Sequence, residues 1–354
     1  MRILITGGAG FIGQHLARLL VASGHAVTAL DSVSEQVHQE PDAAAARFPG
    51  EVRRGDVADE TVWQQLAPHD VIVHLAAETG TAQSMYEQDR YRRVNVGGTT
   101  LAASWAARWQ VPIVALSSRA VYGEGLLAAG PGQVPLGLDG GPDGTYLPSH
   151  EDDAHRPLSV YGETKSEGEG ALASATAGRV PATIIRPQNV IGYGQALHNP
   201  YTGVLAAFLA RLKEGRELSI YGDGTQTRDF VHVEDLSALI AWCLTYNPPT
   251  TDSARVLNCG TGIRTTLVQL AQYSIDASPN PDVGVGYIDV KRAGDIDHAC
   301  ADLSRLRATG APLPLWSTRD AIADFILSSW HDSGADSAVW DRVLQDLTGR
   351  GLTT

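Results

Sequence analysis

The sequence lacks the features that stabilise small secreted domains or anchor a chain in a membrane. It contains only 3 cysteines, at positions 243, 259 and 300, too few and too scattered for a disulfide framework or a zinc site. No apolar run reaches the ~18 residues that a membrane span requires. The chain opens on an apolar stretch, "RILIT", without a signal-peptide pattern, so we expect a cytoplasmic protein.

Positive charge is also scarce. Lys and Arg together number 27 against 40 Asp and Glu, which gives a formal net charge of −13. Nucleic acid is therefore disfavoured as the main partner, because phosphate backbones are bound by basic surfaces. A nucleotide ligand is not excluded, since backbone amides and a few arginines can hold it. Aromatic residues make up only 6% while glycine is abundant, which suits a layered α/β protein.

Apolar strand patterns alternate with helical patterns through the first half of the chain. Strands that lack polar alternation indicate a parallel sheet covered on both faces. Their alternation with helices predicts an α/β Rossmann fold, a doubly wound parallel sheet that binds ligands at the carboxyl ends of its strands. The expected strands are 2–6, 26–30, 51–57, 70–76, 112–118 and 182–187, and 84–109 is expected to form one long helix or two.

The pattern changes after residue 188. We expect a Rossmann domain over 1–188, a smaller mixed C-terminal substrate-binding domain over 189–333, and a helical tail over 334–354. Near 228–260 a strand and a helix are expected to return to the Rossmann domain. The stretch "LSIYGDGTQTRDFVHV" reads as a hairpin, and the Gly-, Pro- and Asp-rich stretch 124–157 as a lid or a disordered insert.

A glycine-rich stretch, "TGGAGFIG", links the first strand to the first helix. Gly7 allows a tight turn, Gly10 lets the backbone approach a pyrophosphate, and Gly13 lets helix and strand pack closely. The pyrophosphate then lies at a helix N-terminus. Asp31, 18 residues past Gly13, ends the second strand, where a carboxylate binds the ribose hydroxyls and repels a 2′-phosphate. No arginine follows it, so we predict NAD rather than NADP.

Further cofactor contacts are expected on the same loop and at the ends of neighbouring strands. Asp56 and Val57 are candidates for the adenine, although an ordinary loop aspartate would look the same. The remaining expected contacts are Phe11, Ile12, Leu75, Ala76, Ala77 and Ser117, together with Asn95, Tyr161 and Lys165 on helices. Lys165 would hold the nicotinamide ribose hydroxyls.

The stretch "SVYGETKSEGE" places Tyr161 and Lys165 on one helical face, four residues apart. A solvated helix face is the plain alternative. The setting favours catalysis, because Ser117 and Ser118 end the fifth strand just upstream. Ser118 would orient a substrate oxygen and Tyr161 would exchange its proton. A free tyrosine titrates near ~10, so we expect Lys165 and the nicotinamide ring to lower the pKa of the phenol.

These motifs, together with "SSRAVYG", "RPQNVIGYG" and "RDFVHVEDL", resemble the extended short-chain dehydrogenase/reductase superfamily, in particular its sugar-nucleotide epimerase/dehydratase group. The resemblance runs to about residue 310. It implies bound NAD, a nucleotide-diphosphate sugar as substrate, and Ser118, Tyr161 and Lys165 as catalytic residues. It also implies that Asn95 supports the active-site helix, and that a homodimer forms through the helices near 84–107 and 158–177.

The resemblance further assigns substrate contacts. Arg228, Arg292 and Asp295 match diphosphate and ribose contacts, and Asn189 matches an asparagine that reaches the sugar or diphosphate. A surface pair with Asp229 is the alternative for Arg228. Asn199 would hold phosphate or cap a helix, and Ala299 would make one pocket wall small. His74, His198 and His232 have no metal-ligand spacing, so we expect them to be structural and expect no metal site.

The residues after Ser118 reduce the number of reactions that remain possible. Dehydratases of this group carry acidic residues at these positions, and decarboxylases a glutamate, whereas this chain has Arg119 and Ala120. The cysteine of the GDP-mannose 3,5-epimerases is absent from this segment. What remains is 4-epimerisation or a simple 4-oxidoreduction. An arginine does not lose its proton near neutrality, so we expect Arg119 to contact the substrate.

Two stretches, "SSRAVYGEG" and "QALHNPYTGVLAAFLARLKEG", look like those of dTDP-L-rhamnose 4-epimerases. A UDP-glucose-type 4-epimerase and a net 4-keto-sugar oxidoreductase remain alternatives. A non-enzymatic NAD sensor is disfavoured, because such proteins usually lose the tyrosine or the lysine and this chain keeps both.

Overall fold

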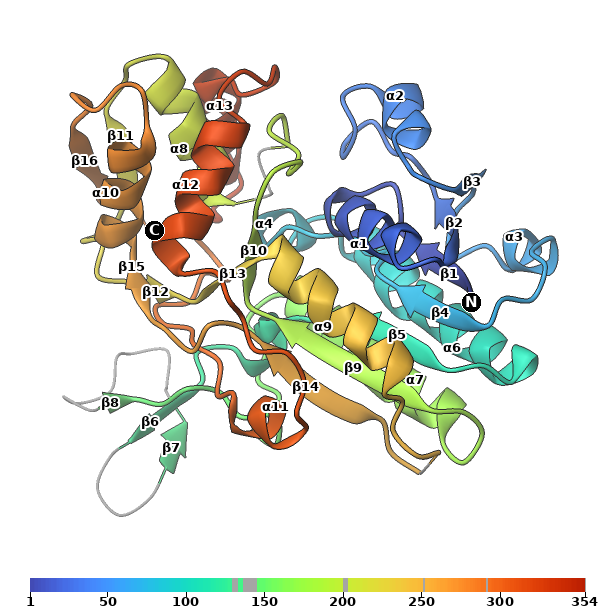
Figure 1. Cartoon of the computed structure of the whole chain (residues 1–354). Helices are drawn as coiled ribbons and strands as arrows, with labels where there is room; N and C mark the ends of the chain where they lie inside the picture. The colour runs from blue at the N-terminus through green and yellow to red at the C-terminus, as the bar shows by residue number, and fades with distance from the viewer. Residues whose placement is uncertain (129–132, 136–144, 200–202, 251, 291, 354) are drawn as a thin grey trace.

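The centre of the protein is a seven-stranded parallel sheet with strand order β14-β9-β5-β4-β1-β2-β3 (Figure 1). The computed structural model describes residues 1–128, 133–135, 145–199, 203–250, 252–290 and 292–353. The predicted doubly wound fold is confirmed, and the strand near 255 does return to the main sheet. The seven strands are β1 (Arg2–Thr6), β2 (Ala26–Asp31), β3 (Glu51–Arg54), β4 (Val71–His74), β5 (Ile113–Leu116), β9 (Ala182–Pro187) and β14 (Arg255–Cys259).

The strand order reverses beside β1, which pairs with β2 on one side and with β4 on the other. Thr6 at the end of β1 lies opposite both Leu30 and His74. Connections leave the sheet in opposite directions at such a switch point, so a crevice opens there. The structure thus places the ends of β1, β2 and β4 around one ligand site.

Helices cover both faces of the sheet. On one face, α1 (Phe11–Ala22) and α9 (Val233–Thr245) lie side by side over Ile3 and Ile5 (Figure 1). On the other, α3 (Glu60–Gln64), α6 (Gly98–Trp109) and α7 (Val160–Thr176) belong to the core around Leu4. Neighbouring strand residues point to opposite faces, which is why Ile3, Leu4 and Ile5 divide between the two cores.

A smaller unit with its own core stands beside the carboxyl ends of the strands (Figure 1). Phe208, Leu270 and Phe325 are at the centre of this core. Its elements are α8 (Val204–Lys213), β11 (Leu218–Tyr221), α10 (Leu267–Ala277), β16 (Val285–Ile288), α12 (Thr318–Ser328) and α13 (Ser337–Gly349).

The predicted hairpin over 218–232 is wrong. Its strands are β11, β12 (Thr227–Arg228) and β13 (Phe230–His232), and each pairs elsewhere. They pair with β16, β15 (Thr265–Thr266) and β10 (Asn189–Ile191), respectively. Glycines at 222 and 224 have positive φ and do turn the chain, but partners distant in sequence provide the hydrogen bonds.

The segment expected to be one or two helices is broken at its start. It comprises α4 (Thr81–Ser84), α5 (Gln88–Tyr91), a π-helical turn (Arg92–Gly97) and α6. Two short helices, α2 (Pro41–Ala46) and α11 (Ser304–Ala308), lie at the periphery. Among the described helices, none combines the length and apolar character needed to cross a bilayer.

Three short strands within the 124–157 stretch form a small antiparallel sheet that projects from the body (Figure 1). Its strands are β6 (Leu126–Ala128), β7 (Gln133–Pro135) and β8 (Thr145–Tyr146), whereas residues 147–157 contain no helix or strand. The rest of the expected lid, 129–132 and 136–144, lies outside the described residues.

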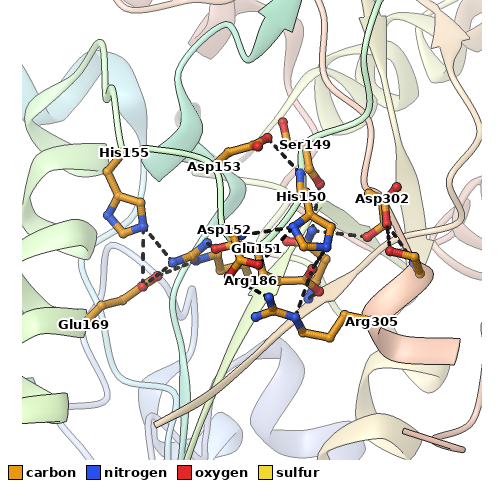
Figure 2. A network of polar contacts seen from close by, with 12 residues as sticks. Ser149, His150, Glu151, Asp152, Asp153, His155, Glu169, Arg186, Asp302 and Arg305 are labelled. Carbon is orange, nitrogen blue, oxygen red and sulfur yellow. Dashed lines mark hydrogen bonds and ion pairs between the residues drawn. The ribbon is translucent and has the colours of Figure 1, made fainter. Parts of the chain in front are cut away.

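The end of this stretch is tied to the body by a buried polar network (Figure 2). Arg186 on β9 donates from Nε and Nη2 to both carboxylate oxygens of Glu169 on α7, at 2.8 and 2.7 Å. Its Nη1 donates to Tyr122 at 2.8 Å and to the carbonyl of Glu151 at 3.0 Å. His155 completes the shell, 2.7 Å from Nη2. One arginine therefore fixes α7 against the sheet.

We expect Arg186→Met to lower the free energy of unfolding by about 3–5 kcal/mol, because it leaves the buried Glu169 carboxylate unpaired. Adding Glu169→Gln should recover a large part of this loss. Arg92→Met, which breaks exposed pairs with Glu163 and Glu167, should cost only about 0–1 kcal/mol. Denaturant unfolding measures all three, and equal effects of the two arginine substitutions would contradict the prediction.

Candidate active site

A cavity of about 1840 Å³ opens at the carboxyl ends of the strands, between the sheet and the smaller unit. Most of the predicted site residues line it. On the Rossmann side these are Gly7, Gly10, Phe11, Ile12, Gly13, Asp31, Asp56, Val57, Leu75, Ala76 and Ala77. At the predicted catalytic and substrate positions they are Arg119, Tyr161, Asn189, Arg228, Arg292 and Asp295.

The glycine loop brings the N-terminus of α1 against the sheet. A Cβ on Gly13 would lie 2.5 Å from the carbonyl oxygen of Gly8, and a Cβ on Gly7 2.8 Å from the nitrogen of Ala76. Only glycine fits at such distances. No side chain caps α1, and its first turn contains no acidic residue. Its free amides therefore face the cavity, as the binding of a pyrophosphate requires.

Asp31 holds the loop and lines the cavity at once. Its carboxylate accepts hydrogen bonds from the backbone N–H of Ala9 at 2.9 Å and of Val33 at 2.7 Å. Each carboxylate oxygen can accept more than one hydrogen bond, so capacity for ribose hydroxyls remains. Asp56 forms an ion pair with Arg93 and accepts from the N–H of Ala58, which leaves its predicted adenine contact a prediction.

Tyr161 lies in the first turn of α7, where that helix meets the end of β5. Ser159 caps the helix by accepting from the N–H of Gly162 at 3.2 Å, and the N–H of Tyr161 donates to Ser84 at 3.0 Å. Burial raises the pKa of the Tyr161 phenol, against smaller lowering effects of a hydrogen bond with Ser118 and of the charge of Arg119. The phenol, Ser118 and Arg119 thus form one cluster.

The predicted action of Lys165 on Tyr161 stays a prediction, and the structure shows where the lysine is held. Lys165 is buried, and its Nζ donates to the carbonyl oxygen of Leu116 at 3.0 Å. Burial lowers the pKa of this ammonium to about 8, and the Glu169 carboxylate opposes that shift. The long lysine side chain thus reaches the end of β5.

Four predicted residues lie behind the cavity wall: Asn95, Ser117, Ser118 and Lys165. Asn95 accepts from the N–H of Glu78 at 2.8 Å and donates to Thr164 at 3.0 Å. It therefore braces the strand-end loop against α7, as the supporting role implied, and does not line the cofactor cavity. Ser117 has a buried hydroxyl without a partner among the described residues and shares a small void with Lys165.

Seven cavity-lining residues have buried polar side-chain atoms for which no described residue is a partner: Gln14, Arg119, Gln188, Asn189, Gln195, Gln226 and Trp340. Leaving such atoms unpaired costs about 1–3 kcal/mol each. Arg119, Gln188 and Asn189 follow the carboxyl ends of β5 and β9, where a polar ligand in the cavity would satisfy them. Arg119 and Asn189 were expected to contact the substrate, whereas Gln188 was missed.

The two arginines predicted to bind phosphate differ in how many of their N–H groups already have a partner. Arg228 donates through Nη1 and Nη2 to the carbonyls of Thr227, Asp297 and Ile296, so most of its fork is already used. Arg292 pairs through Nε with Asp295 at 2.9 Å and lies over the ring of Tyr221. The alternative in which Asp229 pairs with Arg228 is wrong, because Asp229 accepts from the loop N–H groups of Thr261, Gly262 and Ala301.

A model of the NAD dependent epimerase/dehydratase family matches residues 3–260. The chain belongs to this family. The dTDP-L-rhamnose 4-epimerase of Burkholderia thailandensis is 35% identical over 93% of this chain and 94% of that protein. The UDP-glucose 4-epimerase of Mycolicibacterium smegmatis is 30% identical, over 92% and 96%. A solved UDP-N-acetylglucosamine 4-epimerase from Methanobrevibacter ruminantium, in complex with UDP-N-acetylmuramic acid, superposes with a TM-score of 0.77 at 25% identity, covering 92% and 97%.

Family membership confirms the resemblance and makes the protein an NAD-dependent enzyme of the sugar-nucleotide epimerase group. One of the finer expectations needs correction, and one of the two alternatives for Asn199 is excluded. Ala299 is buried but does not line the cavity; His298 does, with its ring centroid 3.9 Å from that of Tyr146 in the projecting sheet. Asn199 lines the cavity and does not cap α8, whose N-cap is Gly203.

The tail beyond residue 333 adds wall residues that the sequence did not reveal. Trp340, Asp341, Val343 and Leu347 on α13 line the same cavity as Arg292. Asp341 pairs with Arg211 of α8 at 2.6 Å, and the carbonyl of Leu352 accepts from the N–H of Ala293 at 2.9 Å. No local sequence pattern identifies these residues as functional, because they reach the cavity only where the C-terminal tail folds back onto it.

The three histidines have different surroundings. His74 bridges Thr6 and Thr99 at 2.8 and 3.0 Å, and burial lowers its pKa to about 3, so it is neutral. His232 stacks on Trp316, whereas His198 lines the cavity. Within the described ranges, no group of three or more His, Cys, Asp or Glu side chains is arranged to hold a metal ion.

We expect the protein to bind NAD more tightly than NADP, because the Asp31 carboxylate lies where the 2′-phosphate would be. Asp31→Ala combined with Ser32→Arg should shift the ratio of the two dissociation constants toward NADP by about tenfold or more, as expected when like-charge repulsion is removed. Calorimetric titration with each cofactor measures the ratio. Ser32→Arg alone is the matched control, and equal affinity of the unmodified protein for both cofactors would refute the prediction.

Tyr161→Phe should lower kcat by about 10²–10⁴, the range for loss of one acid–base group. NAD binding should persist, because the glycine loop and Asp31 are unchanged. Tyr193→Phe is the control, since Tyr193 lines the cavity with 44% of its surface exposed. Near-normal turnover of the Tyr161 variant would exclude the phenol as the proton-exchanging group.

Proposed function

We propose that the protein epimerises C4 of a nucleotide-activated hexose by transient oxidation, with dTDP-L-rhamnose, giving dTDP-6-deoxy-L-talose, as the first candidate. The observation that carries the proposal is that one cavity contains both the glycine loop and the Tyr161 phenol. A dinucleotide and a sugar nucleotide thus share a single space of about 1840 Å³.

The residues present fit NAD. The uncapped N-terminus of α1 and the close-packed glycines suit a pyrophosphate, and Asp31 suits the ribose hydroxyls. Asp56, Val57 and the strand-end residues 75–77 are expected to hold the adenine half. Ser117 and Lys165 are expected to hold the nicotinamide half. When bound, NAD supplies the hydride acceptor and then the hydride donor at C4.

In this reaction the side chains of the protein transfer one proton. Tyr161 as phenolate takes the proton from the C4 hydroxyl during oxidation and returns it during reduction. Ser118 interacts with the phenol and orients the same oxygen. Arg228 and Arg292 are expected to hold the diphosphate while the keto sugar turns, so that its other face meets the cofactor.

The cavity residues favour epimerisation over elimination. Water loss across C5 and C6 needs an acid and a base after the catalytic serine, and those positions are Arg119 and Ala120. The 35% identical dTDP-L-rhamnose 4-epimerase supports the first candidate substrate. The 30% identical UDP-glucose 4-epimerase makes UDP-galactose the second compound to test.

The assembly and cellular placement stay predictions. The expected homodimer uses the helices near 84–107 and 158–177, now seen as α5 to α6 and α7, which pack on each other. Cytoplasmic localisation, and the division into domains at residues 188 and 333, are likewise expectations from the sequence.

An epimerase returns the hydride that it removed. With dTDP-L-rhamnose deuterated at C4, we expect the 4-epimer to form without added cofactor and with deuterium still at C4. Mass spectrometry and NMR of the product measure the label, and UDP-galactose deuterated at C4 runs in parallel. Release of one NADH per turnover would move the protein to the oxidoreductase alternative.

A further inference from the structure

The projecting sheet reaches the active-site cavity at Tyr146, which lies on β8 and lines the cavity wall. Two unrelated segments hold this residue in place. On β6, Leu127 lies opposite Tyr146 in the antiparallel register. From the loop between β14 and β15, Nη2 of Arg264 donates to the carbonyl oxygen of Tyr146 at 3.0 Å. The stretch that the sequence indicated as a lid or a disordered insert thus places an aromatic side chain at a fixed point of the cavity.

The ring of Tyr146 packs on the ring of His298, with centroids 3.9 Å apart. His298 lines the same cavity, and its Nδ1 lies 3.0 Å from the hydroxyl oxygen of Thr227. Burial, followed by the charge of Arg264, lowers the pKa of the imidazole below its usual range, so this ring is neutral near neutral pH. The two rings, called the Tyr146–His298 pair below, therefore form an uncharged part of the cavity wall.

Both ends of the 124–157 stretch hold the segment that carries His298. At the start of the stretch, Glu124 accepts a hydrogen bond from the N–H of Asp297 at 2.9 Å. Near its end, Ser149 forms a parallel bridge with Ala301. The stretch and the segment around His298 are therefore joined at three points, of which the ring contact is one, and the pair is a built feature of the fold.

On one side, the pair adjoins the expected diphosphate contact. Thr227, which is bonded to His298, immediately precedes Arg228 on β12. Nη1 of Arg228 donates to the carbonyl oxygen of Asp297, the residue before His298, at 3.1 Å. The guanidinium and the two rings are thus neighbours along one stretch of wall.

On the other side, the pair adjoins the turn that follows Ser118. That short 3-10 turn leads directly to Glu124, whose carboxylate also lies 3.5 Å from the backbone nitrogen of His298. The turn packs on the first turn of α7, because a Cβ on Gly162 would lie 2.6 Å from the carbonyl oxygen of Ala120. The pair therefore lies between the expected diphosphate contact and the elements that carry the predicted catalytic residues.

A substrate that reaches from Arg228 to Tyr161 has its sugar beside these two rings. Aromatic rings offer a large apolar contact surface, which suits the C–H faces of a sugar, whereas a phosphate is bound by charged groups. We propose that Tyr146 is a specificity-determining residue, whose ring, supported by His298, packs against the hexose of the nucleotide sugar. This inference rests on the proposed function and assigns the sugar end of its substrate.

The test compares a nucleotide sugar with the nucleoside diphosphate that lacks the sugar, by calorimetric titration of the NAD-bound protein. Tyr146→Ala should raise the dissociation constant of dTDP-L-rhamnose by about tenfold and that of dTDP by less than about twofold, as expected for loss of an aromatic contact confined to the sugar. Tyr146→Phe keeps the ring and should bind both ligands as the unmodified protein does. UDP-galactose and UDP form the second pair of ligands.

Two further variants sharpen the comparison. Tyr287→Ala is the matched control, because it removes an exposed ring on β16 that does not line the cavity, and it should leave both dissociation constants unchanged. The double variant Tyr146→Ala/His298→Ala should lose no more affinity for the nucleotide sugar than the weaker-binding single variant, because groups in contact act as a unit. Additive losses would overturn the supporting role of His298.

Equal weakening of dTDP and dTDP-L-rhamnose in Tyr146→Ala would overturn the proposal, because the ring would then contact the base or the diphosphate, or the cavity would have changed. Unchanged affinity for the nucleotide sugar, or a loss in Tyr146→Phe as large as in Tyr146→Ala, would overturn it too. The proposed function is judged separately, by turnover of either nucleotide sugar by the unmodified protein. The two can therefore fail independently.

Discussion

The site depends on one close contact, between the glycine loop and the first turn of α1. The Gly13 position lies so near the carbonyls of Gly7 and Gly8 that any side chain would separate helix from loop. This contact points the free amides of α1 into the crevice at the strand-order reversal. Asp31 holds the same loop from the end of β2. The sheet thereby creates an anion site from backbone groups, without using the chain's scarce positive charge.

The second half of the site depends on how firmly α7 is held. Asn95 connects it to the loop after β4, and Arg186 connects it to β9 and to the segment that follows the projecting sheet (Figure 2). The α7 residues that they bind, Thr164 and Glu169, follow Tyr161 along the helix. A phenol that exchanges a proton with a substrate oxygen needs this precision, because acid–base catalysis falls off steeply outside hydrogen-bonding distance.

Charge is distributed unusually in this cavity. Arg119, Arg228 and Arg292 line the cavity of this acidic protein, and of these three only Arg292 forms an ion pair with a carboxylate among the described residues. Arg228 uses main-chain carbonyls, which fix its position without cancelling its charge. Such a wall suits a diphosphate and developing negative charge on an oxygen.

The sequence by itself determined the sheet, the glycine loop, Asp31 and the Ser118–Tyr161 pair, because each is encoded by neighbouring residues in a periodic or motif-like pattern. The family assignment followed from the same local patterns. Only the tertiary structure decided where Lys165 reaches, which partners the strands between 218 and 232 take, and that His298, Tyr146 and α13 line the cavity while Ala299 does not. These outcomes rest on contacts between segments far apart in the chain. Packing and hydrogen bonding with distant segments decide the partners of a long side chain, a short strand or a returning helix. No local sequence pattern encodes these partners.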